Sequence, residues 1–238
     1  QGDVPFDTLE CKGVKRYVPL TLPYQRMNYK TIIKGGDSLV EVKRSKFIGI
    51  VRPVSSAEEA DEILRGERKK YHDAKHHCSA YIIRGENGAP DIVHSSDDGE
   101  PSGTAGAPIL EVLNGADLKD VVLVVTRYFG GTLLGTGGLV RAYTDAAKAA
   151  LESAVISEMM LMQQFSAVFD YPHTGVIDRY IQDKGISRID AVYTDRVEYK
   201  LACQQSAYDG VIKELVDLTG SSITIDKGDL CFTASGSE

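Results

Sequence analysis

The first half of the chain shows a strand pattern followed by a helix pattern. Polar and apolar residues alternate over residues 38–51, and this two-residue period predicts one strand. Ser55 and Ser56 then precede two glutamates, which indicates a helix start, because a serine side chain caps free amides and acidic side chains complement the helix dipole. We expect this helix to continue to about Lys70.

Short strands, two glycine-rich loops and two further helices complete this half. A hairpin turn is expected at Glu86-Asn87-Gly88, because Asn-Gly pairs favour tight turns. Five successive apolar residues centred on Leu123 predict a strand that is buried on both faces. The expected elements are strands at residues 77–84 and 91–95, a short helix at residues 109–113 with Pro108 in its first turn, a strand at residues 119–126 and an alanine-rich helix at residues 137–154.

The second half of the chain follows a different order of elements. Its pattern predicts strand, helix, strand, strand, helix and strand, at residues 159–170, 174–184, 186–193, 196–203, 206–218 and 221–231. This β-α-β-β-α-β order is typical of a ferredoxin-like domain. Thr174 and Ser206 stand where the two helices begin, so we expect their hydroxyl groups to cap those helices.

These elements divide the chain into three segments. Residues 1–26 contain three prolines and show no clear period, so we interpret them as an N-terminal extension in front of a natural start at Met27. Residues 27–154 and residues 155–238 form the two predicted domains. The predicted fold class is therefore α+β, with a glycine-loop domain followed by a ferredoxin-like domain.

Composition indicates a globular protein without a membrane helix. Of 238 residues, 42% are hydrophobic and 26% are charged. No apolar run approaches the ~20 residues that a membrane helix needs. The four cysteines contain no CxxC pair, so we expect no zinc site, no redox pair and no cofactor. Scattered thiols without an export signal favour the cytoplasm, and the lack of a long coiled-coil stripe favours a monomer.

The charge distribution restricts where a polyanion could bind. A net charge of −7 argues against non-specific coating of nucleic acid. Residues 153–238 hold 13 acidic and 7 basic residues, so a polyanion would have to use a local patch on the first domain. The candidate cations are Lys43, Arg44 and Lys46, and on the first helix Arg65, Arg68, Lys69 and Lys70, with Lys75 beyond it. Interspersed acids on that helix also fit an ordinary solvated face.

The first glycine-rich loop, residues 95–106, leads into a helix. Its glycines allow close approach of the backbone, and free amides at a helix N-terminus favour an anion. The candidate anion-binding residues here are Ser102, Gly103 and Thr104. The carboxylates of Asp97, Asp98 and Glu100 point instead toward a hard cation, and a capped turn with solvated acids is a further alternative.

The second glycine-rich loop, residues 127–138, follows a buried strand and precedes a helix, which is a common setting for a phosphate site. It has neither a P-loop ending nor the usual dinucleotide GxGxxG spacing. Tyr128 and Phe129 could stack on a base or belong to the core. The candidate anion-binding residues are Arg127, Gly130, Gly131, Gly135, Gly137, Gly138 and Arg141.

A histidine pair lies at the start of one predicted strand. His76 and His77 would face opposite sides of that strand, so they cannot easily share a metal ion. A nucleophilic role for Cys78 would need a lowered pKa and a basic partner. A strand start with one buried and one exposed histidine is the simpler interpretation.

Both loops together resemble the signature of the YigZ/IMPACT family. The stretches that carry the resemblance are residues 95–106 (SSDDGEPSGTAG), 126–131 (TRYFGG) and 134–143 (LGTGGLVRAY), with earlier landmarks at residues 43–47 and 73–77. The resemblance implies a first domain like the second domain of ribosomal protein S-five, a fold shared with domain IV of elongation factor G. It implies a second domain like domain V of that factor. Eukaryotic IMPACT proteins regulate translation by competing for the activator of a stress kinase, through a different partner domain.

Three functional hypotheses follow. The leading one is non-enzymatic binding of RNA, the ribosome or a translation factor through the glycine-rich loops, with a role in translation regulation. The alternative is a hydrolase or transferase acting on a phosphorylated or peptide-like small molecule, with Asp97, Asp98, Glu100 and His76 as catalytic candidates. In a third, the loops are only tight turns in a protein-binding module. The first two require that the loops meet in space and direct their amides at a common anion.

Overall fold

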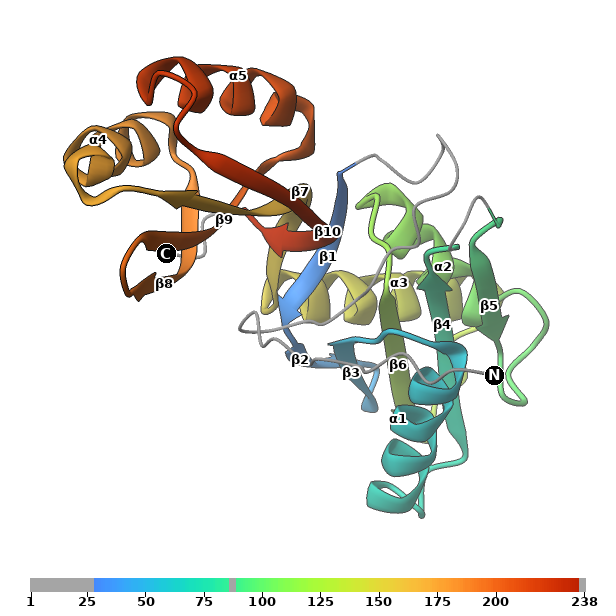
Figure 1. Cartoon of the computed structure of the whole chain (residues 1–238). Helices are drawn as coiled ribbons and strands as arrows, with labels where there is room; N and C mark the ends of the chain where they lie inside the picture. The colour runs from blue at the N-terminus through green and yellow to red at the C-terminus, as the bar shows by residue number, and fades with distance from the viewer. Residues whose placement is uncertain (1–27, 86–88, 236–238) are drawn as a thin grey trace, which may run out of the picture. The chain divides into compact units, whose positions relative to one another are not determined.

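The structure is a computed structural model that describes residues 28–85 and 89–235 (Figure 1). The chain has a mixed α/β architecture and divides into two compact units between Met159 and Met160. Each unit is described by itself below. The predicted extension at residues 1–26 and the predicted turn at residues 86–88 lie outside the described residues.

In its described residues, the N-terminal unit contains a five-stranded sheet and three helices. The strand order is β2-β3-β6-β4-β5, and each neighbouring pair is antiparallel. The elements are β1 (Tyr29–Lys34), β2 (Gly36–Val42), β3 (Ser45–Pro53), α1 (Ala57–Lys70), β4 (His76–Ile83), β5 (Ile92–Ser96), α2 (Gly106–Gly115), β6 (Val121–Tyr128) and α3 (Thr136–Glu152). Strand β1 is not part of this sheet and pairs with the beginning of β7 (Val155–Phe169).

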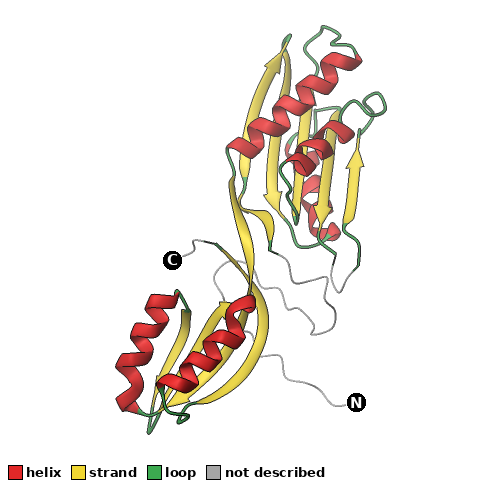
Figure 2. Ribbon diagram, turned by 90° about the horizontal axis from the view of Figure 1, so that it is seen from above, coloured by secondary structure: helices red, strands yellow, loops and turns green. Residues whose placement is uncertain are grey.

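Helices cover both faces of the five-stranded sheet (Figure 2). Leu123 and Val125 pack into the core beneath α2 and α3, whereas Val122 and Val124 pack beneath α1. This alternation along β6 confirms the predicted strand with two buried faces. Ser56 accepts a hydrogen bond from the Glu59 amide at 3.2 Å, so the predicted serine cap of α1 is confirmed as well.

One end of this sheet, called the loop end below, collects the segments that the sequence singled out. Because β3 and β4 both run antiparallel to β6, Lys46 lies opposite Tyr128 and His76 lies opposite Arg127. The β2–β3 turn, the start of β4 and the ends of β5 and β6 therefore meet at the loop end. Both glycine-rich loops leave the sheet there.

One prediction about the first strands was wrong, and one strand was missed. Residues 38–51 form a hairpin rather than one strand, and β1 was not predicted. The hairpin turn consists of Lys43 and Arg44, whose φ angles are +47° and +66°. Two-residue hairpin turns with positive φ normally contain Asn or Gly, so this turn carries no recognisable sequence signal.

The C-terminal unit has the predicted β-α-β-β-α-β order. The elements are the later part of β7, α4 (Thr174–Lys184), β8 (Ser187–Tyr193), β9 (Val197–Gln204), α5 (Tyr208–Leu218) and β10 (Thr224–Ala234). The sheet order is β10-β7-β9-β8. Phe165, Ile177, Tyr199 and Leu215 belong to the core between this sheet and its helices.

The predicted caps of α4 and α5 were wrong. A short 3-10 turn precedes each helix, at Tyr171–His173 and Gln205–Ala207. Thr174 is consequently the first residue of α4, and Ser206 lies inside the second 3-10 turn. Among the described residues, the N-cap positions of both helices, His173 and Ala207, make no side-chain capping hydrogen bond.

Candidate functional site

The first glycine-rich loop uses its amides internally. The Asp97 carboxylate accepts hydrogen bonds from the amides of Gly103, Ala105 and Gly106 at 2.8, 3.0 and 2.8 Å. The amide and the hydroxyl group of Thr104 both donate to the carbonyl oxygen of Pro101. These groups already have partners within the loop, so the predicted contact of Gly103 and Thr104 with an anion has no geometric support and stays a prediction. The neighbouring Ser102 is exposed.

A buried cluster around Glu100 connects the two loops. Arg127 Nη1 donates to Glu100 Oε1 at 2.5 Å, and the Tyr143 hydroxyl group donates to the same oxygen at 2.9 Å. Only 3% of the Glu100 side chain and 7% of the Arg127 side chain are exposed. The thiol of Cys78 donates to the carbonyl oxygen of Asp97 at 3.0 Å. The two loops therefore meet in space, which is the first requirement of the first two hypotheses. The second requirement, that both loops direct their amides at a common anion, is not met by the first loop, whose amides are used internally.

Arg127 has a structural role in this cluster. Besides its ion pair with Glu100, its guanidinium carbon lies 5.5 Å from the ring centroid of Phe47 and 5.7 Å from that of Phe129. Burial of this ion pair leaves little guanidinium surface for a further anion. The predicted contact of Arg127 with an external anion therefore has no geometric support and stays a prediction.

The catalytic candidates are near one another, but their carboxylates have internal partners. His76 Nδ1 lies 2.9 Å from the carbonyl oxygen of Asp98, which can only accept, so this nitrogen is the donor. The other ring nitrogen of His76, Nε2, lies 4.0 Å from Glu100 Oε1. The Asp98 carboxylate accepts from Arg68 Nη2 and from the His77 amide, each at 2.6 Å.

Neither Cys78 nor His77 is prepared for catalysis. Burial raises the pKa of the Cys78 thiol to about 12, so the thiolate that a nucleophile needs is not populated near neutral pH. Burial, with the nearby Arg68 guanidinium, lowers the pKa of His77 and keeps its ring neutral. The simpler interpretation of this strand start is borne out for His77, which is buried, while His76 is partly exposed.

Gly130 holds the β2–β3 turn against the second glycine-rich loop. Its amide donates to Ser45 Oγ at 3.0 Å, and a Cβ atom at this position would overlap the backbone of Arg44 and Ser45. This contact places Lys43 and Arg44 beside the loop. Gly130 therefore serves backbone packing, and its predicted contact with an anion has no geometric support.

The second loop leaves the start of α3 open. Gly135 precedes the helix with φ +72°, and no described side chain caps the helix. Thr136 and Gly137 are exposed, and Arg141 is exposed one turn beyond Gly137 on the same helix face. The first amides of a helix have no partner within it, so this start differs from that of α2, which Asp97 caps.

We call the surface formed by these two elements the basic turn site. Its residues are Lys43 and Arg44 of the turn, Gly131 and Gly135 of the loop, and Gly137, Gly138 and Arg141 of α3. Its three cations, Lys43, Arg44 and Arg141, are exposed and make no ion pair with another residue of the described ranges. On α1, by contrast, Arg65, Arg68 and Lys70 pair with Glu62, Asp98 and Glu67. The basic face of α1 is thus largely neutralised.

Comparisons with known proteins identify the family. A family model described as the Impact N-terminal domain matches residues 43–151, and a domain of unknown function, DUF1949, matches residues 168–221. YvyE of Bacillus subtilis, named as an IMPACT family member, is 36% identical over 205 residues, which cover 86% of this chain and 93% of YvyE. The chain belongs to the IMPACT family.

Further relatives of this IMPACT chain agree with that assignment. YigZ of Escherichia coli is 38% identical over 134 residues, covering 55% of this chain and 64% of YigZ. A crystal structure of a hypothetical protein, 29% identical, superposes with a TM-score of 0.54 and covers 83% of this chain and 96% of its own. The resemblance to the YigZ/IMPACT family is confirmed, and the Impact N-terminal match includes both glycine-rich loops.

Across residues 28–85 and 89–235, no three His, Cys, Asp or Glu side chains form a group that could hold a metal ion. In the same part of the chain, no helix combines the length and the apolar character that a membrane crossing needs.

Replacing Asp97 with asparagine is expected to lower the free energy of unfolding by about 1–2 kcal/mol at pH 7, as for a lost charged cap. Burial favours a higher pKa for this carboxyl group, but the amides of Gly103, Gly106 and Ala105 outweigh burial and hold its pKa below the ordinary 3.8. The stabilisation is thus present above about pH 3.8 and lost as the pH falls through the lowered pKa.

Urea unfolding of the wild type and the Asp97→Asn variant between pH 7 and pH 3 measures this effect. The difference in unfolding free energy should shrink below pH 4 or so, because the wild-type carboxylate becomes protonated. The exposed Asp145→Asn variant of α3 is the matched control and should change little. A difference between wild type and Asp97→Asn that is constant with pH would contradict the assigned role of Asp97.

Proposed function

We propose that this IMPACT chain is a non-enzymatic RNA-binding protein of the translation machinery, and that it binds the phosphate backbone at the basic turn site. The observation that carries the proposal is the contact of Gly130 with Arg44 and Ser45, which brings unpaired cations next to the loop that leads into the open start of α3. Arginine and lysine side chains and free helix amides are the groups that bind phosphate oxygens in nucleic-acid complexes.

The local charge explains how an acidic protein can bind a polyanion. Although the net charge is −7, the three cations of the basic turn site have no acidic partner among the described residues. Electrostatic attraction at phosphate contacts depends on nearby charges, because salt screens charges that are more than about 10 Å away. A local patch therefore suffices for binding, and the acidic remainder disfavours non-specific coating.

The implied fold likenesses support a ribosomal partner. The N-terminal domain is proposed to resemble the second domain of ribosomal protein S-five and domain IV of elongation factor G. The C-terminal domain is proposed to resemble domain V of the same factor. These likenesses concern proteins that contact the ribosome, and they favour ribosomal RNA or a ribosomal complex over an unrelated nucleic acid.

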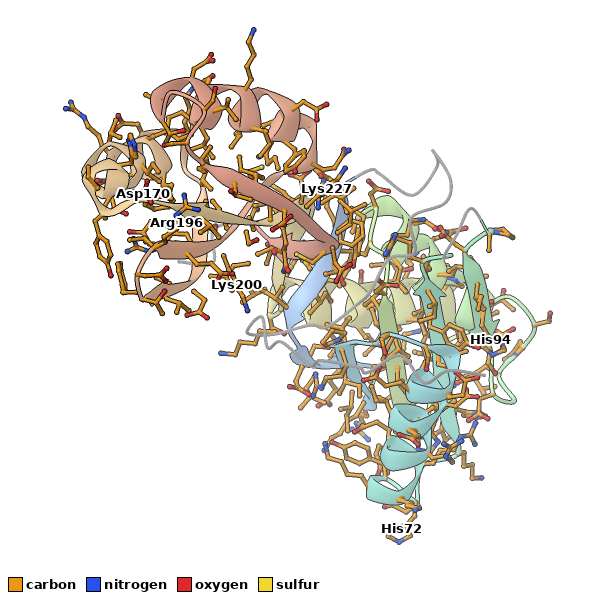
Figure 3. The ribbon with its side chains drawn as sticks, in the orientation of Figure 1. His72, His94, Asp170, Arg196, Lys200 and Lys227 are labelled. Carbon is orange, nitrogen blue, oxygen red and sulfur yellow. The ribbon has the colours of Figure 1, made fainter. Side chains whose placement is uncertain are left out.

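The open face of the C-terminal sheet is a poorer candidate for the RNA site. The strand register places Ser166, Lys200 and Asp190 in one row of this face and Val168, Glu198 and Val192 in the next. Lys200 is labelled in Figure 3. None of these described residues is aromatic, whereas sheets that bind single-stranded RNA present aromatic side chains for stacking. We therefore assign RNA contact to the N-terminal unit.

The alternative function, a hydrolase or transferase, has weaker support. His76 and Glu100 are close, as that hypothesis required, but Glu100 is paired with Arg127. The Asp97 carboxylate accepts hydrogen bonds from loop amides, and the Asp98 carboxylate accepts from Arg68 and from the His77 amide. Neither carboxylate is therefore free to act as a catalytic acid or base. The carboxylates hold the loop end together, which favours the binding function.

Exchanging Lys43 for asparagine and Arg44 for glycine is expected to weaken RNA binding at least tenfold. Both cations are lost, so the slope of log affinity against log salt should fall by about 1.4–1.8, or ~0.7–0.9 per phosphate contact. Asn-Gly adopts two positive φ angles more readily than Lys-Arg, so the fold should be retained. Fluorescence anisotropy with ribosomal RNA fragments and filter binding with ribosomes, each at several salt concentrations, measure the effect.

The double variant Arg65→Gln and Lys69→Gln on α1 is the matched control. It removes the same charge from a face that lies outside the basic turn site, and it should change affinity and salt slope much less. Equal losses in both double variants would show that only net charge matters. Wild-type protein that binds neither RNA nor ribosomes at low salt would refute the proposed function.

A further inference from the structure

Phe129 is an exposed aromatic side chain beside the basic turn site. Of its surface, 56% is exposed, although it directly follows the central strand β6. The neighbouring Tyr128 is engaged differently, because its hydroxyl group donates to Asp73 and its ring packs edge-on against Tyr71. Of the two aromatic residues that could stack on a base, Phe129 is therefore the available one.

The inner face of the Phe129 ring is supported by a contact with Arg127. The guanidinium carbon of Arg127 lies over the ring at 5.7 Å from its centroid. Arg127 is itself held by its buried ion pair with Glu100 and by contact with Phe47. A ring that is supported from within and exposed outside loses little conformational freedom when a planar group stacks on it.

Cations lie close to this ring. The next residue, Gly130, contacts the backbone of Arg44 and Ser45, so the basic turn begins one residue away from Phe129. A nucleotide presents a charged phosphate and a planar base on the two sides of its sugar. An arrangement of cations next to an aromatic ring matches both parts, as in proteins that bind single strands.

We propose that the basic turn site binds single-stranded RNA, with one unpaired base stacked on Phe129. This inference rests on the proposed function and adds the strand class of the ligand. In a duplex the bases are stacked on each other and their faces are covered, so only the phosphate contacts would remain. Leu133, which is 83% exposed, adds apolar surface to the same loop.

The experiment compares an unstructured RNA oligomer with a duplex of the same length, using fluorescence anisotropy and the full chain. Wild-type protein should prefer the single strand. Phe129→Leu should weaken single-strand binding about tenfold, leave duplex binding unchanged and leave the salt slope unchanged, because stacking releases no counterions. Phe129→Trp keeps an aromatic face and should bind the single strand at least as well as the wild type.

The outcomes separate this inference from the proposed function. Absence of binding to either RNA refutes both. Equal binding of single strand and duplex, with no effect of Phe129→Leu, overturns only the inference and leaves phosphate binding in place. A loss in Phe129→Leu that also lowers the salt slope overturns the inference too, because it shows that the variant displaces the basic turn.

Discussion

Replacing Arg127 with methionine is expected to lower the free energy of unfolding by about 3–5 kcal/mol, the usual cost of breaking a buried ion pair from one side. Glu100 would remain with 3% of its side chain exposed and with the Tyr143 hydroxyl group as its remaining partner in the cluster. The substitution also removes the contacts with Phe47 and Phe129. Urea denaturation followed by circular dichroism measures the loss.

Two further variants define the role of the Arg127–Glu100 pair. Adding Glu100→Gln to Arg127→Met removes the unpaired charge, so the double variant should recover part of the stability that the single variant loses. Arg188→Met is the matched control, because Arg188 and Asp178 pair at 2.8 Å but are 43% and 44% exposed. Its cost should be about 0–1 kcal/mol. Equal costs at Arg127 and Arg188 would show that burial of the first pair is unimportant.

Replacing Gly130 with alanine is expected to lower both stability and RNA affinity. The added Cβ would overlap backbone atoms of Arg44 and Ser45, which cannot move aside as the end of a flexible side chain can. Overpacking of this kind costs about 1–3 kcal/mol and occasionally more. The turn must move away from the loop, so we also expect at least a tenfold loss of RNA affinity, measured with the same oligomers.

Gly66→Ala on α1 is the control for Gly130→Ala. No heavy atom lies within 4 Å of a Cβ at this helical position, so alanine should stabilise the protein by up to about 1 kcal/mol. Its RNA affinity should equal that of the wild type. A Gly130→Ala variant with wild-type stability and affinity would show that the contact with the turn is not required.

Most elements of the fold could be predicted because their signals are local. The apolar run of β6 shows burial on both faces, and Ser56 with the acids that follow it marks the start of α1. The β2–β3 hairpin could not be predicted, because Lys43 and Arg44 adopt positive φ without a glycine or an asparagine. That conformation is imposed by strand pairing and by the contact with Gly130, which are tertiary effects.

The sequence predicted which residues lie at the loop end better than it predicted what each of them does there. Sequence motifs selected both loops, His76 and Arg127, and these segments lie at one end of the sheet. A capped turn with solvated acids was one interpretation of the first loop, but the Asp97 carboxylate was not predicted as the cap, because a loop sequence does not tell which group its amides face. The position of the basic turn beside the second loop depends on the antiparallel register of β3 and β6, which the sequence does not encode locally.

The left-handed backbone of Lys43 and Arg44 has a consequence for protein engineering. A laboratory selection that rewards heat tolerance alone should favour asparagine and glycine at these two positions, since a strained conformation costs about 1–3 kcal/mol per residue. The selected variants would be more stable, but they would have lost both charges of the β2–β3 turn. Libraries built from this scaffold should therefore keep the pair constant.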